Sequence, residues 1–236
     1  MKHSWKTAAC LLVVLILTTL FIKGQKQAKY EDHPDVTKFP TIEYQNRKAS
    51  NLSAKQIRRR KKHNSRSPAI TEKTDQILQH SDWELGLPAL PIAKSVAVVI
   101  GEVTTAQAYF SEDESQIYSE FDVRVNEVLK NHDQPFGDAI VVERLGGRVK
   151  FPSGKTAVSS VAHQDLPQVG KRYVLFLIHE YSGDEDYTIL TGYELRNGLV
   201  FPLDTPGSGH PILAYTGVAE TSFRNDLINA LTKISQ

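Results

Sequence analysis

Residues 116–130, with the sequence QIYSEFDVRVNEVLK, alternate apolar and polar side chains over an unusual length. The residues of one parity are apolar, namely Ile117, Phe121, Val123 and Val125. This period of two predicts a half-buried β-strand, and a strand of this length has to coil or bend to remain packed. A second long apolar run, residues 95–110, precedes it and contains Gly101, where a bend or bulge is expected. The pair predicts the spine of a small antiparallel barrel.

Further strand-like segments follow at the spacing typical of small barrels. They are expected at residues 139–145, 148–151, 156–161, 171–180, 187–195 and 199–203, with 156–161 as a short edge strand. Gly146-Gly147 and Asn197-Gly198 supply tight hairpin turns, because these residues tolerate positive φ. From Thr221 onward, an amphipathic helix is expected to dock its apolar side on the barrel. The predicted fold is therefore mostly β, with six or seven strands in antiparallel order and a C-terminal helix.

The N-terminal residues 1–23 carry a membrane-targeting pattern. Lys2 and Lys6 precede an uncharged run, residues 7–22, which is longer than the apolar region of a signal peptide and close to the roughly 18–20 residues of a membrane span. No A-x-A-like cleavage site comes after it, which favours an uncleaved single-pass anchor over a removed signal. Because such segments usually export the domain C-terminal to them, the domain is expected outside the cytoplasm. The alternative orientation leaves it facing the cytoplasm.

Residues 24–69 are polar and show no sustained period, which predicts a disordered tether. Its centre concentrates positive charge at Arg58, Arg59, Arg60, Lys61 and Lys62. Such a run is either a solvated block of like charge that keeps the tether extended, or a contact for a polyanion such as anionic lipid or an envelope polymer. No aromatic residue is interleaved, so stacking on nucleic-acid bases is not favoured. Residues 70–94 then predict a short helix at 71–83 and an extended lead-in.

The hairpin that comes after the spine is the best candidate for a partner-binding face. It carries three basic residues, Arg144, Arg148 and Lys150, which are expected to project from one face. Three cations on one face favour an anionic ligand or partner, and the alternative is an ordinary solvated face. The hairpin falls within the barrel, which is assigned to residues 95–205, and a loop and the C-terminal helix occupy residues 206–236.

No catalytic or metal-binding motif is recognisable. The sequence lacks G-x-S-x-G, H-E-x-x-H and a phosphate-binding loop, and its histidines are scattered singly. The acidic residues 111–115 lack the ligand spacing and the glycine of a calcium loop, so a solvated turn is expected there. The single cysteine, Cys10, lies in the N-terminal apolar run, which leaves no disulfide for the folded part. No catalytic residue, cofactor or metal is predicted, and a hydrolase with an unrecognised site is the alternative.

Several runs together resemble a group of uncharacterised bacterial membrane-anchored envelope proteins. They are IGEVTTAQAYF, SEFDVRVNEVLKN, VERLGGRVKFPSG, VGKRYVLFL and ILTGYELRNG, all within residues 95–203. The order of strands is also similar to that of OB-like barrels of the netrin-module type. The resemblance implies a small OB-like β-barrel and brings no activity with it.

The leading hypothesis is a non-enzymatic extracytoplasmic module that binds an envelope protein or an anionic polymer. The alternative is a cytoplasm-facing domain whose basic segment binds nucleic acid or anionic lipid.

Overall fold

The computed structural model describes residues 35–47, 52–79, 86–131, 136–179 and 186–234. The chain divides into two compact units, Met1–Glu31 and Asp32–Gln236, and all the described residues belong to the second. The predicted anchor, residues 1–23, lies outside the described ranges. Within those ranges, no helix has the length and apolar character needed to cross a bilayer.

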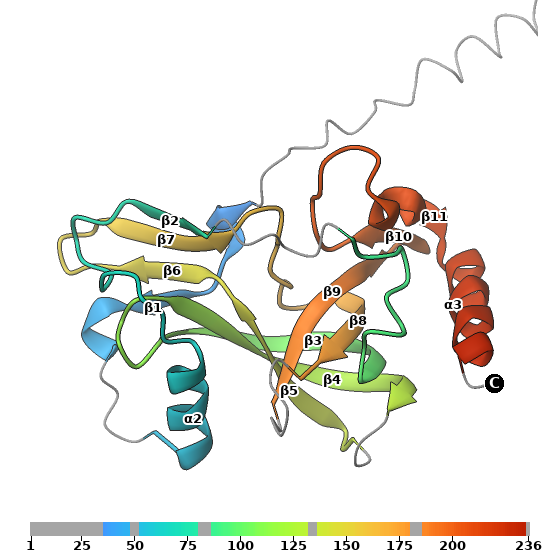
Figure 1. Cartoon of the computed structure of the whole chain (residues 1–236), viewed down its shortest axis with the longest axis horizontal. Helices are drawn as coiled ribbons and strands as arrows, with labels where there is room; N and C mark the ends of the chain where they lie inside the picture. Colours follow the sequence, from blue (N-terminus) through green and yellow to red (C-terminus); the bar gives the residue numbers. More distant parts are fainter. Residues whose placement is uncertain (1–34, 48–51, 80–85, 132–135, 180–185, 235–236) are drawn as a thin grey trace, which may run out of the picture. The chain divides into compact units, whose positions relative to one another are not determined.

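A closed ring of five paired strands forms the centre of the described unit (Figure 1). Its members are β3 (Ala97–Phe110), β4 (Ile117–Asn131), β5 (Ala139–Leu145), β8 (Arg172–Ile178) and β9 (Tyr187–Arg196). Strand β3 pairs antiparallel with β4 and β8, and β5 and β9 pair antiparallel with β4 and β8 respectively. A short parallel pairing of β5 with β9 closes what we call the strand ring. The mostly β prediction is confirmed, whereas the unbroken antiparallel order is wrong at the β5–β9 pair.

The predicted spine is formed by β3 and β4, which pair along almost their whole length. Their register shifts between Ile100 and Gly101, as expected for a bulge at this glycine. A Cβ atom added to Gly101 would lie only 2.4 Å from Cγ1 of Val123, so a larger residue would force the two strands apart. Phe121 and Val123 of β4 are fully buried in the main apolar cluster, on the parity that the alternation predicts.

Beyond β9, the chain extends the sheet and then covers it with a helix. The elements are β10 (Leu199–Pro202), η3 (Pro211–Tyr215), β11 (Val218–Ala219) and α3 (Glu220–Ile234). Asn197 and Gly198 join β9 to β10 and both have positive φ, 53° and 73°, which is the hairpin geometry expected of this dipeptide. Phe223 and Leu227 of α3 are buried in a second apolar cluster that includes Tyr193. The docked C-terminal helix is therefore confirmed.

A second, smaller sheet adjoins the strand ring in Figure 1. Its order is β1 (Thr41–Glu43), β6 (Gly147–Lys150), β7 (Thr156–Val161) and β2 (Gln76–Gln79). Two predictions are wrong here. The segment 71–83 contains strand β2 within its described part, not a helix, and β7 is an inner strand because β6 and β2 flank it. Both outer strands come from distant upstream segments and pair in parallel, so the local pattern of residues 71–83 and 156–161 does not reveal them.

The prediction of a disordered tether at residues 24–69 is wrong for its described part. This part contains η1 (Val36–Lys38), β1, η2 (Tyr44–Asn46) and α2 (Ala54–Lys62). Helix α2 begins with a capping box, in which the Ser53 hydroxyl accepts from the Gln56 backbone N–H and the Gln56 side chain accepts from the Ser53 N–H. Ile42 and Ile70, on either side of α2 in sequence, are buried. A few well-placed apolar residues, together with ion pairs to distant strands, order a segment that composition alone classifies as disordered.

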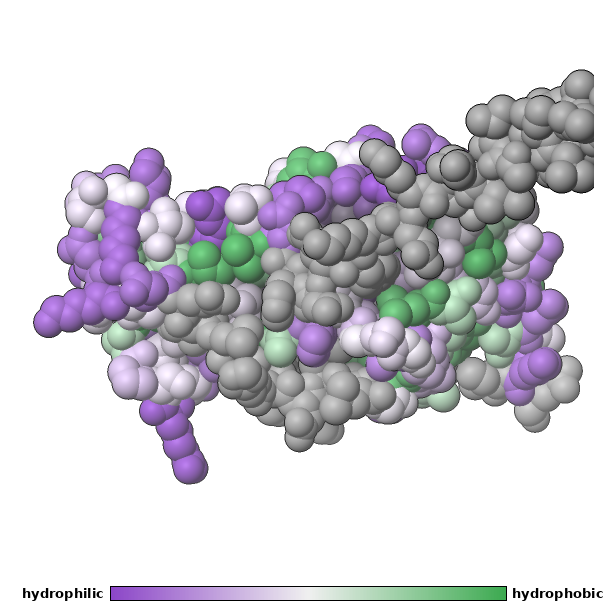
Figure 2. Space-filling model, turned by 90° about the horizontal axis from the view of Figure 1, so that it is seen from above, coloured by the Kyte–Doolittle hydropathy of each residue, from purple (hydrophilic) through white to green (hydrophobic). Residues whose placement is uncertain are grey.

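Exposed large apolar side chains are scattered over the described surface. They are Ile57, Val128, Val169, Leu199 and Ile228. In the view of Figure 2, the apolar areas of the described residues form separate patches. Single exposed apolar residues are ordinary on soluble proteins. Charged and polar groups are therefore the better guide to a functional site.

Candidate functional site

The hairpin predicted at Gly146-Gly147 is wrong, because β5 and β6 belong to different sheets and do not pair with each other. Its predicted basic face does not exist either, because Arg144 is fully buried. Its guanidinium forms a bidentate pair with Asp204, with Nη1–Oδ1 and Nη2–Oδ2 distances of 2.7 and 2.9 Å. It also donates to the carbonyls of Asp165 and Leu190. With the amide oxygen of Gln164 turned toward it, Nε donates over 2.6 Å as well. All of these partners belong to the protein itself, so Arg144 holds loops onto β5.

Arg148 and Lys150 remain at the surface, on β6. Arg148 donates to the carbonyl of Thr37 over 3.0 Å, and Lys150 lies 3.5 Å from a carboxylate oxygen of Glu43, so both connect β6 to the neighbouring segment 37–43. Their strand neighbour Val149 is buried. Two of the three predicted residues therefore share a face, and the third does not.

Helical geometry divides the basic run between two directions. Arg59 is only 4% exposed, and Arg60 donates to the carbonyls of Phe110, Ser111 and Arg47. Lys62 also points inward, whereas Arg58 and Lys61 are exposed. The prediction of a solvated block of like charge in an extended tether is therefore wrong, because a period of 3.6 residues turns Arg59, Arg60 and Lys62 toward the protein.

The inward side of α2 meets a group of buried carboxylates, Glu120 on β4, Glu143 on β5 and Asp186 next to β9, which we call the acidic face. Glu120 and Glu143 are direct cross-strand neighbours. Arg59 bridges two members, with Nη1 2.8 Å from Glu120 Oε2 and Nη2 2.9 Å from Asp186 Oδ1. The sequence analysis missed these carboxylates because their positive partners lie far away in the chain.

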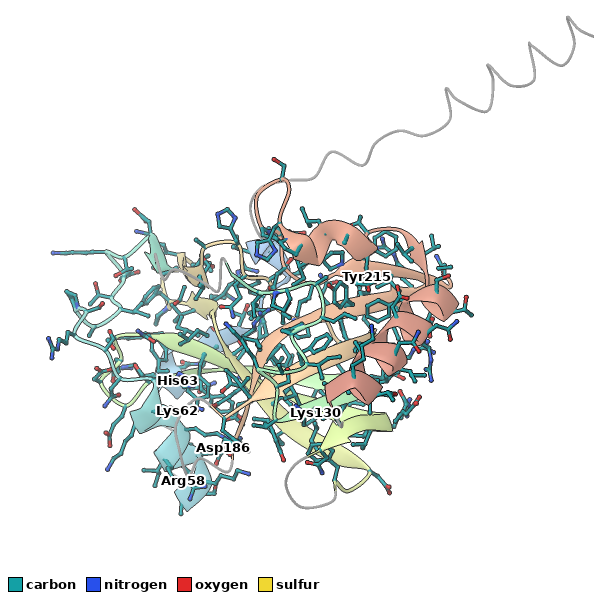
Figure 3. All side chains as sticks on the ribbon, turned by 45° about the vertical axis from the view of Figure 1, so that its right-hand side comes forward. Arg58, Lys62, His63, Lys130, Asp186 and Tyr215 are labelled. Atoms are coloured by element: carbon teal, nitrogen blue, oxygen red, sulfur yellow. The ribbon has the colours of Figure 1, made fainter. Side chains whose placement is uncertain are left out.

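The rest of the contact is made by Lys62 and His63. The ammonium of Lys62 bonds to the Glu143 carboxylate and lies 3.2 Å from Oγ1 of Thr188. Nε2 of His63 is 3.3 Å from the other oxygen of Glu143, and its ring stacks on Tyr118 with 4.3 Å between centroids. Figure 3 shows Lys62, His63 and Asp186 gathered between α2 and the strand ring, with Lys130 and Tyr215 away from this group.

Burial and ion pairing change the carboxyl pKa values in opposite directions. Burial raises the pKa of Glu120, and neighbouring Glu143 adds to this effect while Arg59 opposes it. Burial also disfavours the Glu143 carboxylate, but its hydrogen bonds and charge interactions with His63 and Lys62 outweigh burial and lower its pKa. The pKa of Asp186 is lowered in the same way, with Arg59 and Lys55 outweighing burial. The acidic face thus depends on the cations of α2 for its charge.

This arrangement is closed to a substrate. His63 and Glu143 have the geometry of a base and the group that orients it, but both are buried beneath α2. Within the described ranges, no group of at least three His, Cys, Asp or Glu residues is placed to hold a metal ion. In the acidic turn 111–115, the Asp113 carboxylate accepts from Ser111, Ser115 and the Ser65 backbone, so it fastens the segment after α2 to this turn.

An open pocket lies where η2 meets the turn between β6 and β7. Its volume is about 310 Å³, and its lining residues are Glu43, Tyr44, Gln45, Lys150, Phe151, Pro152 and Gly154. The rings of Tyr44 and Phe151 pack with centroids 4.8 Å apart. The side chains of Lys150 and Glu43 are 53% and 45% exposed. The pocket combines an aromatic wall with two accessible charges of opposite sign, and it contains one residue of the predicted basic face.

Comparisons with models of protein families, with curated proteins and with solved structures found no match. Two arrangements in the described part of the chain therefore remain as guides to function. One is the acidic face, which α2 covers, and the other is the open pocket.

Proposed function

We propose that this chain is a non-enzymatic binding module of the bacterial cell envelope, held at the inner membrane by residues 1–23 and built on an OB-like barrel. The strand ring supports the barrel assignment. Its first strand, β3, pairs with the second and fourth strands, and its third strand, β5, pairs with the fifth. This is the Greek-key closure of an OB-fold, an architecture that commonly serves as a binding scaffold.

The partner site of the module is the pocket lined by Tyr44, Phe151, Lys150 and Glu43, and this pocket is the observation that carries the proposal. Concave surfaces with an apolar wall and a few polar groups are the usual form of binding sites. The ionisable groups of the acidic face and of the Arg144–Asp204 pair are already neutralised within the protein. Lys150 and Glu43 lie 3.5 Å apart, but their side chains are 53% and 45% exposed, so a protein or polymer of the envelope can reach both charges.

The geometry argues against the alternative in which a cytoplasmic basic segment binds nucleic acid or anionic lipid. Affinity for a polyanion grows with the number of cations that reach it. Of the five basic residues of the run, Arg59, Arg60 and Lys62 bond to the protein's own groups. Only Arg58 and Lys61 of this run are exposed, which is a small charge for such a contact.

The binding role is tested with the full-length chain immobilised through its C-terminus and exposed to a detergent extract of bacterial envelopes. Substituting Lys150→Ser is expected to reduce the captured partner by about tenfold, since the pocket loses its cation and keeps an uncompensated Glu43. Lys155→Ser is the matched control, because Lys155 belongs to the same turn, pairs with Asp75 and does not line the pocket. Equal capture by both variants would exclude the pocket as the partner site.

Placement at the inner membrane is tested separately with a C-terminally tagged chain in bacterial cells. Protease added after the outer barrier is opened should digest the domain while the inner membrane is intact. Protection until lysis would contradict an extracytoplasmic domain and leave the pocket result standing.

A further inference from the structure

Charged side chains make the contact between α2 and the strand ring, because Arg59 and Lys62 pair with buried carboxylates and Arg60 donates to the carbonyl of Phe110 on β3. None of the three apolar clusters of the described residues contains a member of α2. Ile57, the one large aliphatic residue of the helix, is 43% exposed. Helices of globular proteins ordinarily hold to their domain by an apolar stripe. Here Arg59, Lys62 and the residue after the helix, His63, take that place.

The acidic face is unfavourable for the strand ring by itself. Glu120 and Glu143 are directly opposite each other on neighbouring strands, where like charges are destabilising, and Asp186 adds a third carboxylate. Buried carboxylates are tolerated when they are paired with cations. The pairing of β3, β4, β5, β8 and β9 closes without any residue of α2. A ring that closes by itself yet presents buried carboxylates has the character of a receptor surface with its ligand bound.

The ligand has a definite pattern. Arg59, Lys62 and His63 are spaced i, i+3 and i+4, which aligns them on one side of a helix. Arg59 connects β4 to the start of β9, while Lys62 and His63 take the two oxygens of Glu143. The capping box at Ser53 and Gln56 stabilises the start of the helix by local contacts.

We propose that the acidic face is a recognition site for a basic helix presenting Arg, Lys and His at i, i+3 and i+4, that α2 is its resident ligand, and that a basic helix of a partner protein exchanges with α2. Charge complementarity selects this occupant, since three carboxylates require cations at matching positions. The exchange is feasible because an ion-pair contact loses far less on separation than an apolar core does, as the separated charges regain water. The face shares no residue with the pocket, so the two proposals stand or fall separately.

The exchange is tested with a labelled peptide of residues 52–64 added to the full-length chain, with binding followed by fluorescence anisotropy. The intact chain should bind weakly, because its own α2 competes at a high effective concentration. The Arg59→Ala chain should bind the peptide about tenfold more tightly, since its own helix has lost the central contact. A Lys61→Ala chain is the matched control and should behave like the intact chain, because Lys61 is exposed. A peptide carrying Ala in place of Arg59 and Lys62 should lose about tenfold in affinity for the Arg59→Ala chain.

Each other result overturns the proposal. Equal binding of the native and the doubly substituted peptide would show attraction to charge without recognition. Loss of the cooperative fold in the Arg59→Ala chain would show that α2 is part of the ring's own structure. A dimer of the intact chain formed by exchanged α2 helices would make a second copy the occupant and exclude a separate partner.

Hydrogen exchange on the intact chain gives a second test that needs no substitution. Amides of Ile57 to Lys62 should exchange faster than those of β4 and β5, because α2 can separate while the strand ring stays closed. Loss of protection in helix and strands together would contradict a separable ligand.

Discussion

Arg144 and Arg59 are both buried arginines that bind carboxylates, but the protein surrounds them differently. Arg144 forms a bidentate ion pair with Asp204 and donates its remaining N–H groups to Gln164 and to two backbone carbonyls. Arg59 divides its guanidinium between Glu120 and Asp186, and its Nε has no hydrogen-bond partner within the described ranges. Removal of Arg144 leaves the Asp204 carboxylate buried without its cation, whereas the carboxylates that pair with Arg59 become hydrated if α2 detaches. The first contact is part of the fold, and the second is an interface.

Arg144→Ala should have the largest effect on stability. It leaves the Asp204 carboxylate buried without its cation and should cost about 3–5 kcal/mol in the free energy of unfolding, measured by urea denaturation. Arg148→Ala is the matched control, because Arg148 belongs to the next strand and contacts only an exposed carbonyl, and it should change stability by about 0.5 kcal/mol or less. If Arg144→Ala lowered the free energy of unfolding only slightly, the region around Asp204 would have to open to water. Arg144 and Arg59 would then no longer differ as a structural contact and a detachable interface.

Arg59→Ala should cost less, about 1–2 kcal/mol, because Glu120 and Asp186 become hydrated once α2 detaches. Urea denaturation followed by near-UV circular dichroism should still show one cooperative transition for the strand ring. Lys61→Ala, on the exposed side of the helix, should leave the midpoint nearly unchanged. A loss as large as that of Arg144→Ala would make the two arginines equivalent and contradict the distinction.

The local sequence pattern predicted those parts of the fold in which residues close in sequence are also close in space. The alternation in β4, the bulge at Gly101, the Asn197-Gly198 turn and the apolar side of α3 are all read from a few consecutive residues. Arg144 and Arg59 were interpreted as surface charges because their partners are distant in sequence. Asp204 lies 60 residues from Arg144, and Glu120 lies 61 residues from Arg59. No local period distinguishes a basic residue in water from one that faces a distant carboxylate. The outer strands of the small sheet, β1 and β2, were missed for the same reason, since they pair with strands far downstream.

The smallest expected effects concern pH, and they should have opposite signs in the two regions. Burial and the nearby Asp204 raise the pKa of Asp165, beside Arg144, from 3.8 to about 6, while Lys38 and Arg144 oppose the shift. Its contribution to stability is therefore complete below pH 3.8 and is lost as the pH rises through about 6. The pKa of Glu143 is lowered from 4.5, so its contribution is present above pH 4.5 and is lost as the pH falls through the lower folded value.

Urea denaturation between pH 3 and 7 measures this contrast with the substitutions Asp165→Asn and Glu143→Gln. As the pH rises, the free energy of unfolding of the Asp165→Asn chain should increase relative to that of the intact chain by on the order of 1 kcal/mol. The reason is that the substitution removes a carboxyl group that is costly to ionise. Over the same range, the free energy of unfolding of the Glu143→Gln chain should decrease relative to that of the intact chain, because the substitution removes a carboxylate that Lys62 and His63 stabilise. In the Glu143→Gln chain, Glu120 also loses the neighbouring charge that helps to raise its pKa, so the difference for this variant reports on both carboxyl groups of the pair. Two slopes of the same sign would show that the carboxyl groups share one environment, and the division between a structural pair and a detachable helix would fail.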